Sequence, residues 1–172
     1  MRSTDDVTDG IPPGRRDPPR ILFVCLGNIC RSPLAEGAMR AAADKADLAI
    51  EVDSAGTGDW HIGRPPDPRA IATARRHGVD ISDLRGRQVR RADFDDFDHL
   101  IALDAKNLAD LRRLRPVTAR AELSMLLDHA DGRAGRDVAD PYFGEDAGFE
   151  TAWDDICAGV DGLVAKLRQP SG

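Results

Sequence analysis

The sequence predicts a single α/β domain in which helices cover both faces of a parallel sheet. Short apolar runs alternate with longer stretches of helical periodicity, and this alternation is typical of parallel strands joined by crossover helices. At 172 residues, of which 41% are hydrophobic, the chain is long enough for one domain with a proper core.

The first ordered element is expected at residue 20. Residues 1–19 are rich in Pro, Gly and Asp and lack apolar periodicity, so they predict a disordered N-terminal extension. The run Ile21–Val24 is apolar, β-branched and aromatic, which suits a strand buried on both faces. We therefore expect the folded domain to span residues 20–168.

A loop at residues 25–31 follows this strand. Ser32-Pro33 is typical of a helix start, with Ser at the N-cap and Pro at the first helical position. A second strand is expected at residues 50–54 and a loop at 56–66. The next helix, at residues 68–77, should end at Gly78, which suits a left-handed cap.

The second half of the chain continues the alternation. A third strand is expected at residues 100–103 and a helix at 107–114, whereas residues 121–127 are ambiguous between strand and helix. Trp153 should be a core residue of the last helix, and Cys157 a small buried one beside its apolar face. That face carries Phe149, Trp153, Ile156, Val160, Leu163, Val164 and Leu167.

Composition narrows the classes of function. The chain has no run of about 20 apolar residues and no apolar signal-peptide region, so we expect a cytoplasmic protein that does not enter membranes. Export by a route that needs no signal peptide stays open. Three cysteines are too few for a disulfide scaffold and fit a reducing compartment.

Charge argues against nucleic acid as the main partner, because the net charge is −6. Basic residues are concentrated between residues 64 and 91, which include eight arginines. This band is either a basic surface that draws in an anionic substrate or the solvated faces of two helices.

The loop at residues 25–31 carries the clearest chemical signal. Cys25 and Arg31 have five residues between them. Chance produces this spacing easily, so the surrounding sequence must show whether the pair is functional. The loop leaves a buried strand, contains Gly27 and Asn28 where unusual backbone angles are tolerated, and enters a helix. Its backbone N–H groups and those of the helix N-terminus can converge on an anion.

This geometry predicts a nucleophile beside a bound phosphate. Arg31 supplies a planar fork that matches two phosphate oxygens, and the same positive field favours the thiolate of Cys25. The Ser32 hydroxyl could donate a hydrogen bond to that thiolate. Neither metal nor other cofactor is required, because the loop and Arg31 neutralise the transferring group. The expected phosphate-binding residues are Leu26, Gly27, Asn28, Ile29, Cys30, Arg31 and Ser32.

Residues 24–33, VCLGNICRSP, resemble the signature loop of the low-molecular-weight protein tyrosine phosphatases. The resemblance covers about residues 21–167, and the abundance of arginine and alanine suggests a bacterial, actinobacterial-type member. It implies one three-layer domain with a four-stranded parallel sheet. It also implies hydrolysis of phosphotyrosine in proteins through a phosphocysteine on Cys25. The implied partners include a cognate tyrosine kinase, and inorganic phosphate as product and competitive inhibitor.

The family carries its general acid in an Asp-Pro motif, here DPYFG at residues 140–144. The residue before a proline is pushed away from helical angles, so Asp140 should lie on an extended loop. Its implied role is to protonate the leaving phenolate and then to deprotonate the attacking water. An isolated Asp-Pro is usually an ordinary turn, and the loop at Cys25 favours the catalytic interpretation.

Further positions follow from the same resemblance. Trp60, in SAGTGDWH at residues 54–61, would form one wall of a cleft and Tyr142 the other, although Trp60 could instead be a core residue. Asn28, Ser54 and His77 would hold the phosphate loop by hydrogen bonds. His77 could equally be a capping residue before Gly78.

Other family positions carry weaker expectations. Cys30 could form a disulfide with Cys25 that protects the nucleophile from over-oxidation. Asp104 and Asn107 match a family motif, but no chemical role follows for either from the sequence. Many members have a second tyrosine where this chain has Phe143.

Three other functions compete with this one. An arsenate reductase of the same fold typically needs two further thiols far from the loop, and the only cysteine beyond Cys30 is Cys157. A catalytically inactive relative that binds phosphorylated partners would have lost the nucleophile, the arginine or the acid. An arginine-rich nucleic-acid binder would need aromatic residues in its basic band for stacking, and that band has none.

Overall fold

The computed structural model describes residues 18–169 and places a four-stranded parallel sheet at the centre of the molecule. The strand order is β2-β1-β3-β4, and all three neighbouring pairs are parallel. The α/β class and the four-stranded sheet are therefore confirmed. The strands are β1 (Arg20–Cys25), β2 (Glu51–Gly56), β3 (His99–Ala102) and β4 (Glu122–Met125).

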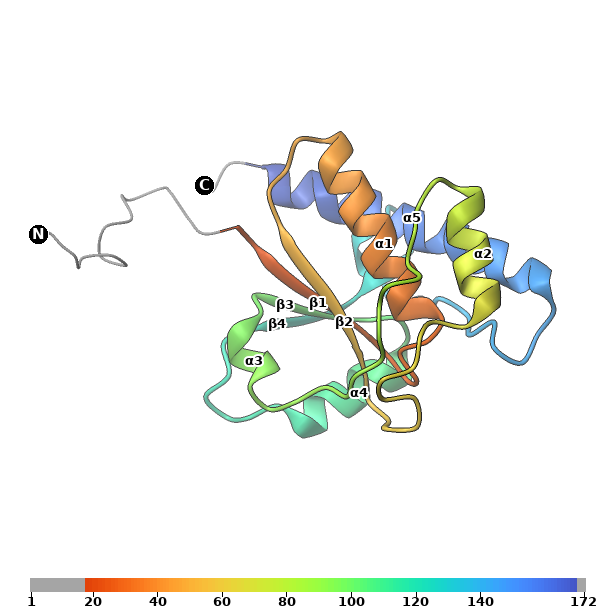
Figure 1. Ribbon diagram of the computed structural model, residues 1–172. Coiled ribbons are helices and arrows are strands. Elements are labelled where there is room, and N and C mark those ends of the chain that lie inside the picture. Colours follow the sequence, from red (N-terminus) through yellow and green to blue (C-terminus); the bar gives the residue numbers. More distant parts are fainter. Residues whose placement is uncertain (1–17, 170–172) are drawn as a thin grey trace, which may run out of the picture.

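Helices cover both faces of this sheet, as predicted (Figure 1). Three of them pack against one another on one face: α1 (Arg31–Lys45), α2 (Pro68–Arg76) and α5 (Asp146–Arg168). The opposite face carries α4 (Ala105–Leu114) and the short α3 (Asp93–Asp96). A 3-10 helix, η2 (Leu126–His129), follows β4 directly.

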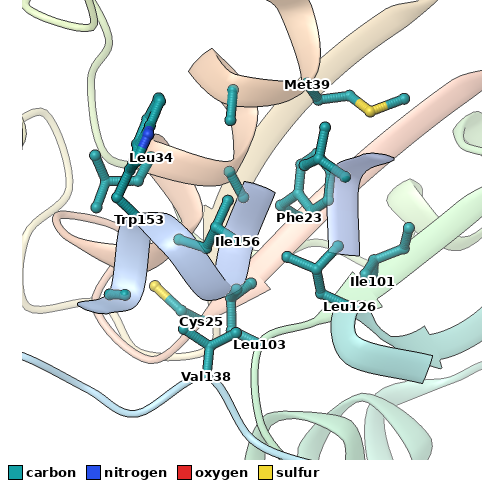
Figure 2. Close-up of a cluster of buried hydrophobic side chains, with 14 of the residues drawn as sticks. Phe23, Cys25, Leu34, Met39, Ile101, Leu103, Leu126, Val138, Trp153 and Ile156 are labelled. Carbon is teal, nitrogen blue, oxygen red and sulfur yellow. The ribbon is translucent and has the colours of Figure 1, made fainter. Parts of the chain in front are cut away.

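Strand β1 is the centre of the core. Its alternate side chains enter two clusters: Ile21 and Phe23 pack toward α1 and α5, whereas Leu22 and Val24 pack on the α4 side. All four are fully buried, which explains why the run is apolar without alternation. Cys25 ends the strand at the margin of the first cluster, near Leu103 and Val138 (Figure 2).

The structure corrects several sequence expectations. Helix α1 begins at Arg31 with Cys30 as its N-cap, so the prediction of Ser32 as the N-cap is wrong. The ambiguous residues 121–127 contain β4 and the start of η2, and α3 had not been expected. The extension predicted at residues 1–19 lies outside the described residues except for its last two.

Helix α5 lies very close to η2, and two of its glycines allow this approach. A Cβ at Gly162 would overlap the carbonyl oxygen of His129, and one at Gly159 would crowd the Leu126 side chain. Gly148, in the first turn of the same helix, has room: a Cβ there would lie 3.5 Å from the nearest atom, the Cβ of Pro141.

We predict that Gly162→Ala lowers the free energy of unfolding by about 1–3 kcal/mol, because α5 and η2 must move apart. Gly148→Ala is the matched control in the same helix. It should be neutral or stabilising by up to about 1 kcal/mol, since alanine is the better helix former. Urea denaturation followed by circular dichroism measures both. Equal effects of the two substitutions would contradict the close packing of α5 on η2.

Candidate active site

A cleft of about 250 Å³ opens at the C-terminal end of β1, where ligands bind in parallel α/β sheets. Cys25 lies in it with only 3% of its surface exposed. The cleft brings together segments that are far apart in the sequence. It is lined by Cys25, Leu26, Gly27, Ile29, Cys30, Arg31, Trp60, His61, Asp140, Tyr142 and Phe143.

The loop after β1 is shaped by Asn28. Its φ of 59° lies in the left-handed region, and its N–H donates to the Cys25 sulfur over 3.3 Å. Its side-chain amide donates to the hydroxyls of Ser32, over 2.8 Å, and Ser54, over 3.0 Å. Its side-chain oxygen accepts from the N–H of Arg87 over 2.9 Å. One buried side chain thus fixes the turn to α1, β2 and the segment before α3.

The remaining N–H groups of the loop are available for a ligand. Within residues 18–169, those of Gly27, Ile29 and Cys30 have no hydrogen-bond acceptor. They precede the first turn of α1, whose own unpaired donors add partial positive charge. Converging N–H groups at a helix N-terminus can bind an anion, so this geometry is compatible with the predicted phosphate site.

Ser32 faces the nucleophile instead of capping the helix. Its hydroxyl oxygen lies 3.0 Å from the Cys25 sulfur and accepts the hydrogen bond from Asn28. With its oxygen engaged in this way, the hydroxyl proton can point at the sulfur and stabilise a thiolate. Ser32 already lies within α1, so its side chain is not used to cap the helix.

Arg31 is buried and held from two sides. Its Nη1 donates to Asp104 and to the carbonyl of Val138, both over 2.8 Å, and its Nη2 lies 3.6 Å from Asp140. Burial on its own lowers the pKa of Arg31, but Cys25, Asp104 and Asp140 outweigh it and raise the pKa above its usual value. The guanidinium therefore stays charged although only 3% of the residue is exposed.

Asp104 is a positioning residue whose role the sequence did not disclose. One carboxylate oxygen accepts from Arg31, while the other accepts from the N–H of Asn107 over 2.7 Å and caps α4. The same carboxylate thus fixes a helix and orients the guanidinium. Asn107 is buried behind it.

Asp140 reaches the cleft because the segment before it docks on the end of β3. The N–H of Val138 donates to the Leu103 carbonyl over 2.8 Å, and that of Ala105 donates to Asp137 over 2.9 Å. The carboxylate of Asp140 then accepts from the N–H of Tyr142 over 3.1 Å and remains partly exposed. The expected extended loop with an accessible acid is present.

Two aromatic residues form the sides of the cleft. Trp60 is 65% exposed, so it is not a core residue, and its ring lies over Gly58. Tyr142 lines the cleft together with Phe143, whose ring meets it edge-on. His61, which the sequence analysis gave no role, packs against Gly27 at 3.1 Å from where a Cβ would stand.

Arg69 joins the two sides of the site, which the sequence did not reveal. It is held by Asp67, whose N–H donates to the Ile29 carbonyl in the phosphate loop over 2.8 Å. Its Nη2 donates to the carbonyl of Tyr142 over 2.9 Å, and its Nη1 to that of Gly144 over 3.3 Å. The loop that carries Asp140 is thus fixed relative to the loop that carries Cys25.

Glu36 lies behind the phosphate loop and is almost fully buried. It accepts from the Ser54 hydroxyl and from Arg40, both over 2.7 Å. Burial raises its pKa, although these hydrogen bonds act in the opposite direction. Because the Ser54 hydroxyl donates to Glu36, its oxygen is left to accept from Asn28.

The two thiols of the loop differ in character. Burial raises the pKa of the Cys30 thiol well above its usual value, and Asp67 and Cys25 raise it further. Cys30 is therefore a protonated thiol at neutral pH. Both cysteines are free, and a disulfide between them stays a prediction. Cys157, on the margin of the core, is also free.

His77 does not hold the phosphate loop, which corrects one of the two expectations for it. It is the C-cap residue of α2, its ring lies 2.8 Å from Glu150, and it stacks on Trp153 at 5.0 Å. The capping alternative is therefore confirmed. The side-chain oxygen of Asn28 in the loop accepts a hydrogen bond from the N–H of Arg87 instead.

Within the described residues, no group of three or more His, Cys, Asp and Glu side chains is placed to hold a metal ion. Among residues 18–169, no helix combines the length and apolar character needed to cross a membrane.

The comparisons with known proteins agree on one family. Residues 20–171 match the family model described as low molecular weight phosphotyrosine protein phosphatase. A phosphatase of that description from Drosophila melanogaster is 46% identical over 78% of this chain and 87% of its own. A low molecular weight protein-tyrosine-phosphatase from Streptomyces coelicolor is 43% identical over 87% and 94%. The structure of YfkJ from Bacillus subtilis, 41% identical, superposes with a TM-score of 0.83 and covers 90% of this chain and 98% of its own.

Asp93 supports the site indirectly, because it holds Arg87, whose backbone N–H donates to Asn28. The Asp93 carboxylate is fully buried and accepts from Arg87, Arg90 and the backbone N–H of Arg90. Burial raises the pKa of Asp93, but these hydrogen bonds outweigh burial and lower the pKa below its usual value. An acid whose folded-state pKa is lowered stabilises the protein above its unfolded-state pKa, and this stabilisation is lost as the pH falls through the folded-state value.

We predict that Asp93→Asn lowers the free energy of unfolding by about 2 kcal/mol at pH 7. The difference from wild type should persist to about pH 5 and shrink below about pH 4, where the carboxyl group of the unfolded chain becomes protonated while that of the folded protein still resists protonation. Urea denaturation at each pH measures it. Asp95→Asn, on an exposed residue of the same helix, is the control. A difference for Asp93→Asn that is the same at pH 7 and pH 3 would argue against the ion pair.

Proposed function

This chain belongs to the low molecular weight phosphotyrosine protein phosphatase family, and from that premise we propose that it hydrolyses phosphotyrosine in proteins through a phosphocysteine on Cys25. One observation carries the proposal. The cleft that contains the Cys25 sulfur is also lined by a buried arginine, Arg31, and an accessible acid, Asp140. A nucleophile, an anion clamp and a proton donor thus share one site.

The phosphate group binds first. The N–H groups of the loop and the guanidinium of Arg31 surround its three non-bridging oxygens, and Leu26 to Ser32 provide the backbone. This places the phosphorus in front of the Cys25 sulfur. The charge of the dianion is balanced by donors that are already in place, so little reorganisation is needed during the reaction.

The phosphoryl group then moves to sulfur. The Cys25 thiolate, stabilised by Ser32 and the N–H of Asn28, attacks phosphorus as the bond to the tyrosine oxygen breaks. Asp140 gives its proton to that oxygen, so the product leaves as neutral tyrosine. The electron pair of the broken bond stays on the phenol oxygen.

Water completes the cycle. Asp140, now a carboxylate, takes a proton from a water molecule that attacks the phosphorus, and the sulfur leaves as a thiolate. Inorganic phosphate is the product. Because it fits the same donors as the substrate, it should also act as a competitive inhibitor.

The shape of the cleft supports phosphotyrosine as the substrate. Trp60 and Tyr142 present aromatic surface at its sides, on which a phenyl ring can pack. Phosphoserine has no ring to pack against these two side chains, so it would lose this contact. We also propose that residues 20–168 form the catalytic domain, with residues 1–19 as an extension, and that a tyrosine kinase supplies the substrate.

We expect wild type to hydrolyse a phosphotyrosine peptide and p-nitrophenyl phosphate without added metal, and Cys25→Ser to reduce both activities to background. Serine is similar in shape and slightly smaller, and its hydroxyl group stays protonated at neutral pH, so it is a much weaker nucleophile than a thiolate. Colorimetric phosphate release measures the activity, and circular dichroism verifies folding. A phosphoserine peptide should remain intact. Retained activity in Cys25→Ser would contradict the assignment of the nucleophile.

We further expect that the effect of removing the general acid depends on how much protonation the leaving group needs. Asp140→Asn should lower kcat/KM by roughly 10²–10⁴-fold for phenyl phosphate, whose phenol is a poor leaving group. The loss should be much smaller for p-nitrophenyl phosphate, whose leaving group needs little protonation.

Arg69→Ala should give the same leaving-group pattern in weaker form, because it releases the loop that holds Asp140. Arg69→Lys should recover little, since an ammonium group lacks the planar fork. Arg75→Ala, an exposed arginine of the same helix, serves as the control. Equal losses for both leaving groups would mean that Arg69 acts on folding and not on the acid.

A further inference from the structure

The mouth of the cleft is surrounded by exposed apolar side chains. Within the described residues, seven large hydrophobic residues are exposed, and only Leu114 and Val117 lie away from the cleft. Four of the other five line the cleft: Leu26, Trp60, Tyr142 and Phe143. The fifth, Ile62, directly follows the cleft residue His61, and we term these five residues the apolar rim. Such a concentration of exposed apolar surface marks a site of contact with another molecule.

Part of this rim is beyond the reach of the phosphotyrosine itself. Phe143 lines the cleft and yet remains 91% exposed, and Ile62, which is 58% exposed, does not line it. A phenyl ring that packs between Trp60 and Tyr142 makes its contacts inside the cleft, whereas Ile62 lies outside the cleft lining and Phe143 is exposed over most of its surface. The exposed Phe143 and Ile62 therefore call for an additional contact.

The main chain of the substrate must pass over this rim. When a phosphotyrosine side chain enters the cleft from its mouth, the backbone that carries it stays outside. Neighbouring residues of an extended segment follow at about 3.3 Å each, so the residues next to the phosphotyrosine come within reach of the rim. Ile62 belongs to the segment after β2 and Phe143 to the segment before α5, so two segments far apart in the sequence carry the rim.

On the basis of the proposed function, we propose that the apolar rim binds apolar side chains that flank the phosphotyrosine in the substrate. The occupant is thus a phosphotyrosine segment with a residue such as Leu, Ile or Phe on either side. Continuity of the rim with the cleft supports this choice. Burying exposed apolar surface on both partners is favourable and needs no matching of charge.

The test uses two phosphotyrosine peptides of equal length and net charge, one with Leu and Ile beside the phosphotyrosine and one with Ser and Gly. For wild type, kcat/KM should be roughly tenfold higher for the apolar peptide. Ile62→Ser and Phe143→Ser should each reduce this ratio, and the double variant should bring it close to one. Both residues are exposed, so the substitutions leave the core intact.

The controls separate this inference from the proposed function. Leu114→Ser and Val117→Ser remove exposed apolar groups away from the cleft and should leave the ratio unchanged. The preference should persist at about 0.5 M NaCl, because apolar contacts are not screened. Three results would overturn the binding role of the rim if p-nitrophenyl phosphate is still hydrolysed. They are a wild-type ratio near one, a ratio that is unchanged in the double variant, and a preference that salt removes. If folded wild type does not hydrolyse p-nitrophenyl phosphate, the proposed function itself is overturned, and so is the binding role of the rim.

Discussion

The hydrogen bonds of Asn28 are the interaction on which the rest of the site depends. A residue with a positive φ is unfavourable unless its surroundings stabilise it, and here the side chain is bonded to α1, β2 and the segment before α3. Gly56 supports the same turn for a steric reason, because a Cβ there would crowd the Leu26 carbonyl and Asn28. The turn that results aims the N–H of Asn28 at the sulfur of Cys25.

A balance of charge follows from this geometry. A buried arginine is costly unless it is paired, and Asp104 and the Val138 carbonyl pair Arg31 before any substrate arrives. Asp140 is different: it lies 3.6 Å from Arg31 and stays accessible to a molecule in the cleft. One acid therefore orients the guanidinium, and we infer that the other performs chemistry. This division follows from burial and distance, since both residues are aspartates.

The sequence predicted the features that are local in the chain. The buried strand, the loop with its left-handed Asn28, the helix ending at Gly78 and the apolar face of α5 each follow from neighbouring residues. The ties that position the site are long-range, and no local pattern discloses them. Arg31 meets Val138 across 107 residues, and Arg69 meets Tyr142 across 73. The sequence left two roles open for His77, because the partners that engage its ring, Glu150 and Trp153, belong to the last helix.

Trapping the phosphoenzyme is the most direct test of Cys25 as the nucleophile. Wild type is mixed with excess phosphotyrosine peptide, denatured within milliseconds at alkaline pH, and digested for mass mapping. We predict one added phosphoryl group on the sulfur of Cys25 in wild type, and none in Cys25→Ser. Turnover without any phosphorylated cysteine, or phosphate on another residue, would contradict it.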